Sequence, residues 1–356
     1  METSILITGA AGYIGGSIVT QLLASSNKLV KKENVIATVR SEEQATALSK
    51  LGITVLRLDL TDENAVVESV LRHNVGIVIH TASSLNTDMA LHLVTALAKQ
   101  KEVSKQETYI IHTSGESAFT ASSGWPHGET KDNGPLFDVE KELADSYPIR
   151  KTDVSVIEHA KVTGVTSFIV IPPMVYGKGS GQWNQLSVLL PVYVQGSISA
   201  KAVHKFANDG TVSAVHISDI AVFYEKLVEK VLLKEPIPSG EKGYYFAKAH
   251  DVQWWEVFDQ LAVALEARGL ATNSTVPIWP DDETAAKVLG VPVQFVSILW
   301  QSVSHMFAVN KQELGWEPAW DKERLLTNID DEIDAVLELG QAKSSLVASL
   351  FDAAKG

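Results

Sequence analysis

The stretch that decides the fold stands at the start of the chain: Ser4-Ile-Leu-Ile-Thr8, followed at once by Gly9-Ala-Ala-Gly12-Tyr-Ile-Gly15-Gly. An apolar run, a glycine-rich turn and an amphipathic pattern, in that order, are typical of a dinucleotide-binding strand–turn–helix unit. Gly9 permits the tight turn, Gly12 lets the backbone approach a pyrophosphate, and Gly15 lets the helix pack closely. Free N–H groups at the helix start attract the phosphates. We therefore predict cofactor contacts from Gly9, Gly12, Tyr13, Ile14 and Gly15.

Further short apolar runs follow along the first half of the chain, at 35–39, 54–60, 76–80, 108–112 and 167–171. Helical patterns lie between several of them, at 14–22, 63–72 and 89–99. Strand alternating with helix predicts an α/β fold of the Rossmann type, with a doubly wound parallel sheet. We predict that residues 1–177 form the dinucleotide-binding domain, to which 212–250 return. The smaller, mainly helical substrate-binding lobe is predicted at 178–211 and 251–356.

The composition narrows the possible functions. The net charge of −13 and the absence of a basic cluster argue against a nucleic-acid partner. Cysteine is absent, and no histidine pair has metal-ligand spacing, so we predict no metal site. No apolar stretch is long enough to cross a membrane, and the first strand at Ser4 leaves no room for a signal peptide. These features predict a cytoplasmic protein with a small-molecule substrate.

The end of the second strand bears on the choice of cofactor. The sequence there reads Thr38-Val39-Arg40-Ser41. A carboxylate at this place binds the ribose hydroxyls of NAD, whereas an arginine accommodates the 2′-phosphate of NADP. Arg40 therefore favours NADP(H), with NAD(H) left open, unless Arg40 is simply a surface charge.

The third and fourth strands end in residues suited to the rest of a dinucleotide. Asp59-Leu60 ends the third, and an acid at this edge can accept a hydrogen bond from an adenine amino group. Small residues after the fourth strand leave room for a cofactor against the backbone: Thr81, Ala82 and Ser83. Each segment also has a simpler interpretation in turn and helix-cap chemistry, as for Asp62 before the next helix.

Taken together with Thr113-Ser114, Pro172–Gly177 and Val215–Asp219, these segments resemble the extended short-chain dehydrogenase/reductase family. The sequences of these segments are most similar to those of fungal nucleoside-diphosphate-sugar epimerase-like and reductase-like proteins. The resemblance implies that Thr113, Pro172 and Val175 also line the cofactor site. It further implies a homodimer formed through helices near 89–99 and 150–163.

Catalysis in that family uses a tyrosine, a lysine four residues later and an upstream serine or threonine. Tyr147-Pro-Ile-Arg-Lys151 has this spacing, which puts both side chains on one helix face. The resemblance implies that Tyr147 transfers a proton, while Lys151 lowers the tyrosine pKa and holds the nicotinamide ribose. An alignment without a gap would instead put Asp145 and Ile149 at these two positions.

The upstream hydroxyl departs from the family pattern. Relatives read Thr-Ser-Ser at the end of the fifth strand, and the last serine polarises the substrate carbonyl. This chain reads Thr113-Ser114-Gly115, so Gly115 stands at the position of that serine. We expect Ser114 to supply the hydroxyl, with Ser117, another neighbouring residue or a water molecule as alternatives.

Three functions follow from these residues. The first is an NADP(H)-dependent oxidoreductase acting on a carbonyl or alcohol of a small molecule. The second is a nucleotide-sugar epimerase or dehydratase with bound NAD. The third is a non-catalytic, NAD(P)-sensing regulator, which Gly115 supports.

The polar, glycine-rich segments 115–145 and 177–183 are predicted to form a mobile wall of the substrate pocket, with Trp125 and Trp183 offering apolar surface.

Overall fold

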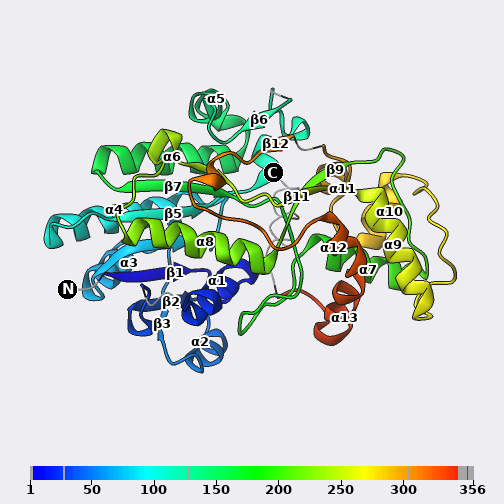
Figure 1. Ribbon diagram of the computed structural model, residues 1–356, viewed down its shortest axis with the longest axis horizontal. Helices are drawn as coiled ribbons and strands as arrows, with labels where there is room; N and C mark the ends of the chain where they lie inside the picture. The colour runs from blue at the N-terminus through cyan, green and yellow to red at the C-terminus, as the bar shows by residue number, and fades with distance from the viewer. Residues whose placement is uncertain (1–2, 27–28, 127, 304, 344–350, 352–356) are drawn as a thin grey trace.

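The computed structural model describes residues 3–26, 29–126, 128–303, 305–343 and 351. Its centre is a seven-stranded parallel sheet of strand order β10-β7-β5-β4-β1-β2-β3 (Figure 1). The strands are β1 (Ser4–Thr8), β2 (Val35–Val39), β3 (Thr54–Arg57), β4 (Val75–His80), β5 (Tyr109–Thr113), β7 (Thr166–Ile171) and β10 (Tyr244–Phe246). The predicted Rossmann-type α/β class is confirmed.

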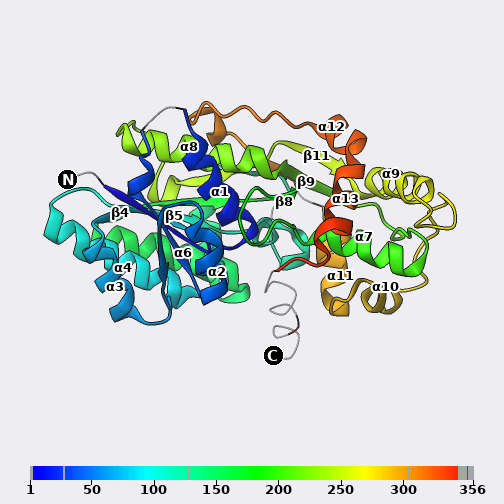
Figure 2. The same cartoon turned by 90° about the horizontal axis from the view of Figure 1, so that it is seen from below.

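Helices cover both faces of this sheet (Figures 1 and 2). On one face α1 (Tyr13–Ala24) packs against α8 (Ile217–Leu232), and on the other α4 (Thr87–Ser104) lies between α3 (Glu63–Arg72) and α6 (Pro148–Thr163). The helix α2 (Glu42–Ser49) follows β2. Successive residues of β1 face opposite layers: Leu6 joins the core under α4, whereas Ile5 and Ile7 join the core under α1 and α8. Burial on both faces explains why these strands read as unbroken apolar runs.

A second region lies to the right of the sheet in Figure 1. Its three-stranded sheet has the order β11-β9-β8, from β8 (Met174–Tyr176), β9 (Thr211–His216) and β11 (His250–Gln253). The helices here are α7 (Leu189–Ala200), α9 (Trp254–Ala267), α10 (Asp282–Leu289), α11 (Val293–Trp300), α12 (Lys322–Thr327) and α13 (Ile329–Leu339). Stacked aromatic rings fill its core, such as Tyr193 on Phe258 with centroids 4.2 Å apart. The predicted mainly helical character of the C-terminal part is confirmed.

The segment from Gly115 to Asp145 is built from short elements. These are η2 (Glu116–Phe119), η3 (Ala121–Ser123), β6 (Thr130–Lys131), α5 (Leu136–Glu142) and η4 (Ala144–Ser146). The strand β6 pairs in parallel with β12 (Met306–Phe307), far along the chain. Next to this pair the buried Asp132 carboxylate accepts hydrogen bonds from the backbone N–H groups of Phe246, Val309 and Asn310. The segment is therefore held by residues from the last third of the chain.

The remaining short helices are η1 (Lys32–Asn34), η5 (Gly240–Lys242) and η6 (Asn310–Gln312). Within the described ranges, no helix combines the length and the apolar character that a membrane span requires.

Candidate cofactor and catalytic site

The turn between β1 and α1 has the backbone shape that phosphate binding requires. Gly9 has a φ of +69°, in the left-handed region that glycine adopts without strain. A Cβ on Gly15 would lie 2.4 Å from the Gly9 carbonyl oxygen and 2.5 Å from Thr81 Oγ1, so no side chain fits there. Gly12 is the N-cap of α1, no side chain caps the helix, and its first turn has no acidic residue. The N–H groups at the start of α1 can therefore receive an anion.

The side chain of Tyr13 is held by the segment that follows β8. Its hydroxyl donates a hydrogen bond to the Gly177 carbonyl oxygen at 2.6 Å, and its ring lies 3.0 Å from where a Gly179 Cβ would be. Any cofactor contact of Tyr13 and of the partly buried Ile14 therefore belongs to their backbone N–H groups. Pro172 is buried and Val175 is half-buried on β8.

Arg40 directly follows β2 and has an exposed side chain, for which the described residues offer no ion-pair partner. The next residue, Ser41, caps α2, and the Gln44 side chain accepts hydrogen bonds from the backbone N–H groups of both Arg40 and Ser41. Glu42 pairs instead with Arg57 at 3.1 Å. The Arg40 guanidinium is therefore available to a phosphate group.

Asp59 lies exposed just beyond β3, and Leu60 beside it is buried. The Asp59 carboxylate accepts hydrogen bonds from the Thr61 hydroxyl at 2.7 Å and its N–H at 2.9 Å, which lower the pKa of Asp59. Asp62 accepts a hydrogen bond from Ala65 N and caps α3, which is the helix-cap role that the sequence also allowed. Asp59 thus remains charged and fixed in place at the sheet edge.

Thr81, Ala82 and Ser83 follow β4 beside the glycine-rich turn. The Thr81 hydroxyl donates to the Thr8 carbonyl oxygen at 2.7 Å, which joins the ends of β4 and β1. Ser83 Oγ accepts from the N–H groups of Leu85 and Asn86 and shapes the turn into α4. An open depression of about 560 Å³ lies here, lined by Ser83, Leu85, Asn86, Thr87 and Asp88.

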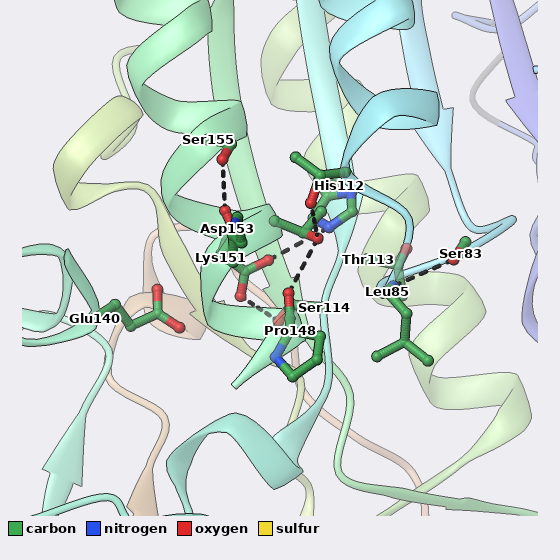
Figure 3. Close-up of polar contacts among 12 residues, drawn as sticks. Ser83, Leu85, His112, Thr113, Ser114, Glu140, Pro148, Lys151, Asp153 and Ser155 are labelled. Carbon is green, nitrogen blue, oxygen red and sulfur yellow. Dashed lines mark hydrogen bonds and ion pairs between the residues drawn. The ribbon is translucent and has the colours of Figure 1, made fainter. Parts of the chain in front are cut away.

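Buried polar groups meet at the end of β5 (Figure 3). Ser114 donates a hydrogen bond from its hydroxyl to Asp153 Oδ2 at 2.5 Å, and His112 Nε2 lies 3.3 Å from Asp153 Oδ1. His112 and Asp153 are fully buried, whereas Ser114 is 6% exposed. Thr113 points to the other face of the sheet, where its hydroxyl bonds that of Tyr224 at 2.6 Å. All four of these residues are buried, and Ser114 and Thr113 keep a small exposed fraction that His112 and Asp153 lack.

The side chains of the predicted pair Tyr147 and Lys151 each contact another residue of the chain. Tyr147 is the N-cap of α6, and its ring lies against the Arg150 guanidinium, 5.3 Å from the ring centroid. Lys151 points to solvent and pairs with Asp145 at 3.3 Å. The α6 side chain that faces Gly115 is Ile149, whose Cδ1 lies 3.5 Å from where a Gly115 Cβ would be.

Asp153, Glu140 and Arg150 are residues that the sequence reasoning missed. Each is fully buried, although each carries an ionisable group. Glu140 accepts a hydrogen bond from the Tyr244 hydroxyl at 2.7 Å, and Arg150 donates to the Ala118 carbonyl oxygen at 2.7 Å. A signal was present in the sequence: Asp153 stands four residues from both Ile149 and Ile157, on an otherwise apolar helix face.

Trp125 packs in the core and does not offer its ring to a substrate. It is 3% exposed, lies edge-on to Phe119 with centroids 5.0 Å apart, and donates its indole N–H to Thr130. Trp183 is half-buried, with the Lys343 ammonium 4.3 Å from its ring centroid. In the part of the chain that the structure describes, no cluster of three His, Asp or Glu residues could hold a metal.

The fold and the phosphate-binding turn define a dinucleotide-binding protein of the Rossmann type, and comparison with known proteins gives the family. Residues 5–236 match the model of the NAD dependent epimerase/dehydratase family. Since this match covers more than half of the chain, the chain belongs to that family. The resemblance to extended short-chain dehydrogenases/reductases is thereby confirmed, and the family consists of NAD-dependent enzymes.

Two of the curated relatives come from fungi. The chain is 23% identical to "Oxidase ucsJ" of an Acremonium species, over 78% of this chain and 82% of that protein. It is 24% identical to "Uncharacterized protein C2A9.02" of Schizosaccharomyces pombe, over 88% of this chain and 94% of the relative.

Solved structures share the fold at lower identity. A UDP-glucose 4-epimerase of Thermotoga maritima, solved with UDP-glucose, is 16% identical with a TM-score of 0.62, over 94% of this chain and all of that one. A dTDP-glucose 4,6-dehydratase of Bacillus anthracis, in complex with NAD, is 13% identical with a TM-score of 0.64, over 95% of this chain and 98% of that one.

Proposed function

We propose that this protein is an NADP(H)-dependent oxidoreductase that reduces the carbonyl group of a small organic molecule, or oxidises the corresponding alcohol. The observation that carries the cofactor choice is the exposed Arg40 at the end of β2, beside the uncapped start of α1. A guanidinium at this place can form charge-assisted hydrogen bonds with a 2′-phosphate. The proposal places the protein in the cytoplasm, as a homodimer.

The residues of the turn bind and orient the cofactor in this proposal, and Ser114 acts on the substrate. NADPH, when bound, supplies a hydride to the carbonyl carbon. The Ser114 hydroxyl lies at the end of β5, at the carboxyl edge of the sheet where ligands of open α/β folds bind. From there it polarises the carbonyl oxygen and donates the proton that the oxygen needs. Tyr147 with Lys151 is the alternative proton donor that the sequence spacing supports.

Two residues favour reduction over nucleotide-sugar epimerisation or dehydration. Relatives with those activities carry an arginine before the segment that starts at Pro172, and an asparagine nearby. This chain has the buried Ile171 and Met174 there. Apolar side chains cannot bind a diphosphate or sugar hydroxyls. The family match and the sugar-nucleotide enzymes among the structural neighbours support the epimerase/dehydratase alternative.

A second candidate is the dinucleotide-sensing regulator. The contact between Ile149 and Gly115 favours it, because an apolar side chain lies where the family places its proton-transferring groups. Such a protein binds NADP(H) and turns nothing over.

Binding and turnover together test the proposal. Calorimetric titration of the wild type is expected to show tighter binding of NADPH than of NADH, and Arg40→Asp is expected to reverse this preference. Arg72→Asp, an exposed charge on α3, is the matched control and should leave it unchanged. NADPH oxidation is then followed with a panel of aldehydes and ketones. Tighter NADH binding by the wild type would overturn the cofactor assignment, and NADPH binding without any turnover would favour the regulator.

A further inference from the structure

A cavity of about 280 Å³ lies between the C-terminal helices α12 and α13 and the ends of β8 and β9. Helices α12 and α13 stand side by side in Figure 1, near the red end of the chain. Four carboxyl groups of α13 line the cavity: those of Asp331, Glu332, Asp334 and Glu338. None of the residues that line it is among the candidate cofactor-binding and catalytic residues. The cavity is therefore a second space for a ligand.

Two of these carboxyl groups already have a cation beside them. Glu338 pairs with Lys178 at 2.6 Å, and Asp334 pairs with Arg268 at 2.8 Å. Asp331 is exposed on the same helix, and the described residues offer it no ion-pair partner. Lys178 is the lysine that lines the cavity. Since it is paired with Glu338, the cavity keeps an excess of negative charge.

Glu332 is the buried carboxyl of the four, with 3% of its surface exposed. Its Oε1 accepts a hydrogen bond from Gly177 N, which is the one donor to this carboxyl among the described residues. The other oxygen, Oε2, has no such donor, and Glu332 lines the cavity. A buried carboxylate needs further partners to offset its lost hydration. A cationic group in the cavity would be such a partner.

The rest of the cavity wall is largely apolar. Leu325 on α12 and Ala335 on α13 are buried, and they line the cavity together with Tyr176 and Trp320. The rings of Tyr176 and Trp320 meet edge to face, with centroids 6.1 Å apart. Such a surface favours the hydrocarbon part of a ligand. The volume is slightly below the range of about 300–1,000 Å³ for drug-sized ligands, so the ligand must be small.

We propose that this cavity binds a small organic ammonium compound. The ammonium group donates charge-assisted hydrogen bonds to Glu332 Oε2 and is attracted by the Asp331 carboxylate, while its hydrocarbon part packs against Leu325 and Ala335. A metal ion fits less well, because no cluster of three His, Asp or Glu residues in the described ranges could hold one. The site does not depend on the proposed carbonyl reduction, because it shares no residue with the groups assigned to that reaction.

Ionisation of Glu332 links the binding of an amine to pH. Burial raises the pKa of Glu332 to about 7. A bound ammonium group stabilises the carboxylate, so binding draws the proton off Glu332. The affinity is therefore expected to fall about tenfold from pH 8 to pH 6, as the carboxyl takes up its proton.

The tyrosines and the histidine that face the cavity keep their charge state between pH 6 and 8. Burial raises the pKa of Tyr13 on α1 and of Tyr176 on β8, so both stay neutral. Burial lowers the pKa of His216, at the end of β9, to about 4, so His216 is neutral from pH 6 upward. The remaining charged groups around the cavity are exposed or paired: Lys178, Arg268, Asp331, Asp334, Glu338 and, against the Trp320 ring, Arg324.

Calorimetric titration of the whole chain with phenethylamine tests the site, and 2-phenylethanol is the uncharged compound of matching size. Phenethylamine is expected to bind at pH 8 with a dissociation constant below about 1 mM, and 2-phenylethanol at least about tenfold more weakly. Equal affinity of the two compounds overturns the proposal. So does the absence of saturable phenethylamine binding up to about 10 mM.

Variants test whether the compound lies in this cavity. Glu332→Gln keeps the size of the side chain and an acceptor for Gly177 N, and is expected to weaken phenethylamine binding about 10- to 100-fold. Asp331→Asn changes an exposed side chain and should weaken binding about two- to fivefold. Glu323→Gln on α12 is the matched control, because Glu323 is exposed and lies outside the cavity lining. Its affinity should equal that of the wild type.

The pH dependence is measured on the wild type with the same compound, which stays protonated from pH 6 to 8 as a lysine does. An affinity that is equal at pH 6 and pH 8 overturns the proposal, and so does unchanged affinity in folded Glu332→Gln.

Circular dichroism and thermal unfolding report whether each variant is folded. If Glu332→Gln does not fold, unchanged affinity in Asp331→Asn overturns the proposal in its place. None of these measurements uses NADPH or a carbonyl compound, so failure of this site and failure of the proposed function are separate results.

Discussion

Ile149 on α6 faces Gly115 at the end of β5, with Ile149 Cδ1 3.5 Å from the place of a Gly115 Cβ. The family resemblance implies a serine at the position of Gly115, and the alignment without a gap puts Ile149 at the position of the lysine. In this chain Ile149 is apolar and Gly115 has no side chain. One helical turn further along α6, Asp153 accepts a hydrogen bond from the Ser114 hydroxyl.

Gly115 is expected to tolerate a serine. Its φ of −163° is extended backbone that any residue adopts, and a Cβ would make an ordinary van der Waals contact with Ile149. Gly115→Ser should change the free energy of unfolding by no more than about 0.5 kcal/mol, as surface-like substitutions do. Urea denaturation measures this change. A loss above about 2 kcal/mol would show that the site is closed by contacts other than that with Ile149.

Gly15→Ala is expected to abolish binding of both NADPH and NADH. The added methyl group would lie 2.4 Å from the Gly9 carbonyl oxygen and 2.5 Å from Thr81 Oγ1, so the turn must change shape. Calorimetric titration measures the loss, and circular dichroism checks that the sheet is intact. Gly128→Ala is the control, because no atom lies within 4 Å of its Cβ position. Unchanged binding in Gly15→Ala would mean that the cofactor does not use this turn.

Lys151→Ala is expected to leave NADPH affinity unchanged, and Tyr147→Phe to keep turnover within a few-fold of the wild type. The Lys151 ammonium pairs with Asp145 on the exposed side of α6, and the Tyr147 ring lies against Arg150. Titration and steady-state kinetics on a substrate that the wild type turns over measure both. A fall in kcat of about 10²-fold or more in Tyr147→Phe would identify Tyr147 as the proton donor, as the sequence spacing predicts.

Glu332 on α13 is expected to destabilise the protein as the pH rises. Its carboxyl is buried and accepts a hydrogen bond from Gly177 N, and burial raises its pKa to about 7. In the unfolded chain the Glu332 carboxyl ionises at its ordinary pKa of about 4.5, whereas in the folded protein it ionises only near pH 7. The free energy of unfolding therefore falls between pH 4.5 and 7, by about 3 kcal/mol in all. Urea denaturation of the wild type and Glu332→Gln at pH 4.5 and 8 isolates this change, because buried histidines affect both alike.

Glu338→Gln serves as the control for Glu332. The Glu338 carboxylate is exposed and pairs with Lys178, so its removal should leave the pH dependence of stability as it is in the wild type. If Glu332→Gln has the same pH dependence as the wild type, Glu332 ionises normally in the folded protein.

The sheet could be predicted from the sequence because its strands are buried on both faces. The runs at 4–8 and 35–39 match β1 and β2 residue for residue, and those at 76–80 and 167–171 each lack the first residue of β4 and β7. The run at 108–112 is shifted by one residue from β5, and that at 54–60 extends three residues beyond β3. The edge strand β10 was not predicted. It has three residues and lies far from the others in sequence, so no periodicity marks it.

The site was harder to predict than the fold. The glycine-rich turn and Arg40 can be recognised from the residues next to them in the sequence. The buried polar residues at the end of β5 depend on the rotation of α6, which begins at Pro148. That rotation turns Ile149 and Asp153 inward and Lys151 outward. The hydrogen bond of Ser114 with Asp153 joins β5 to α6 through space, and no spacing rule encodes it.

The connection at Asp132 has a consequence for how the protein is made. Its carboxylate is satisfied by backbone N–H groups at Phe246, Val309 and Asn310. A ribosome reading from the N-terminus releases Asp132 long before those partners, so the carboxylate must stay hydrated until the chain has been made as far as Asn310. Chains that stop before residue 309 leave the neighbouring segment loose and open to proteases. The connection therefore distinguishes finished chains from prematurely terminated ones.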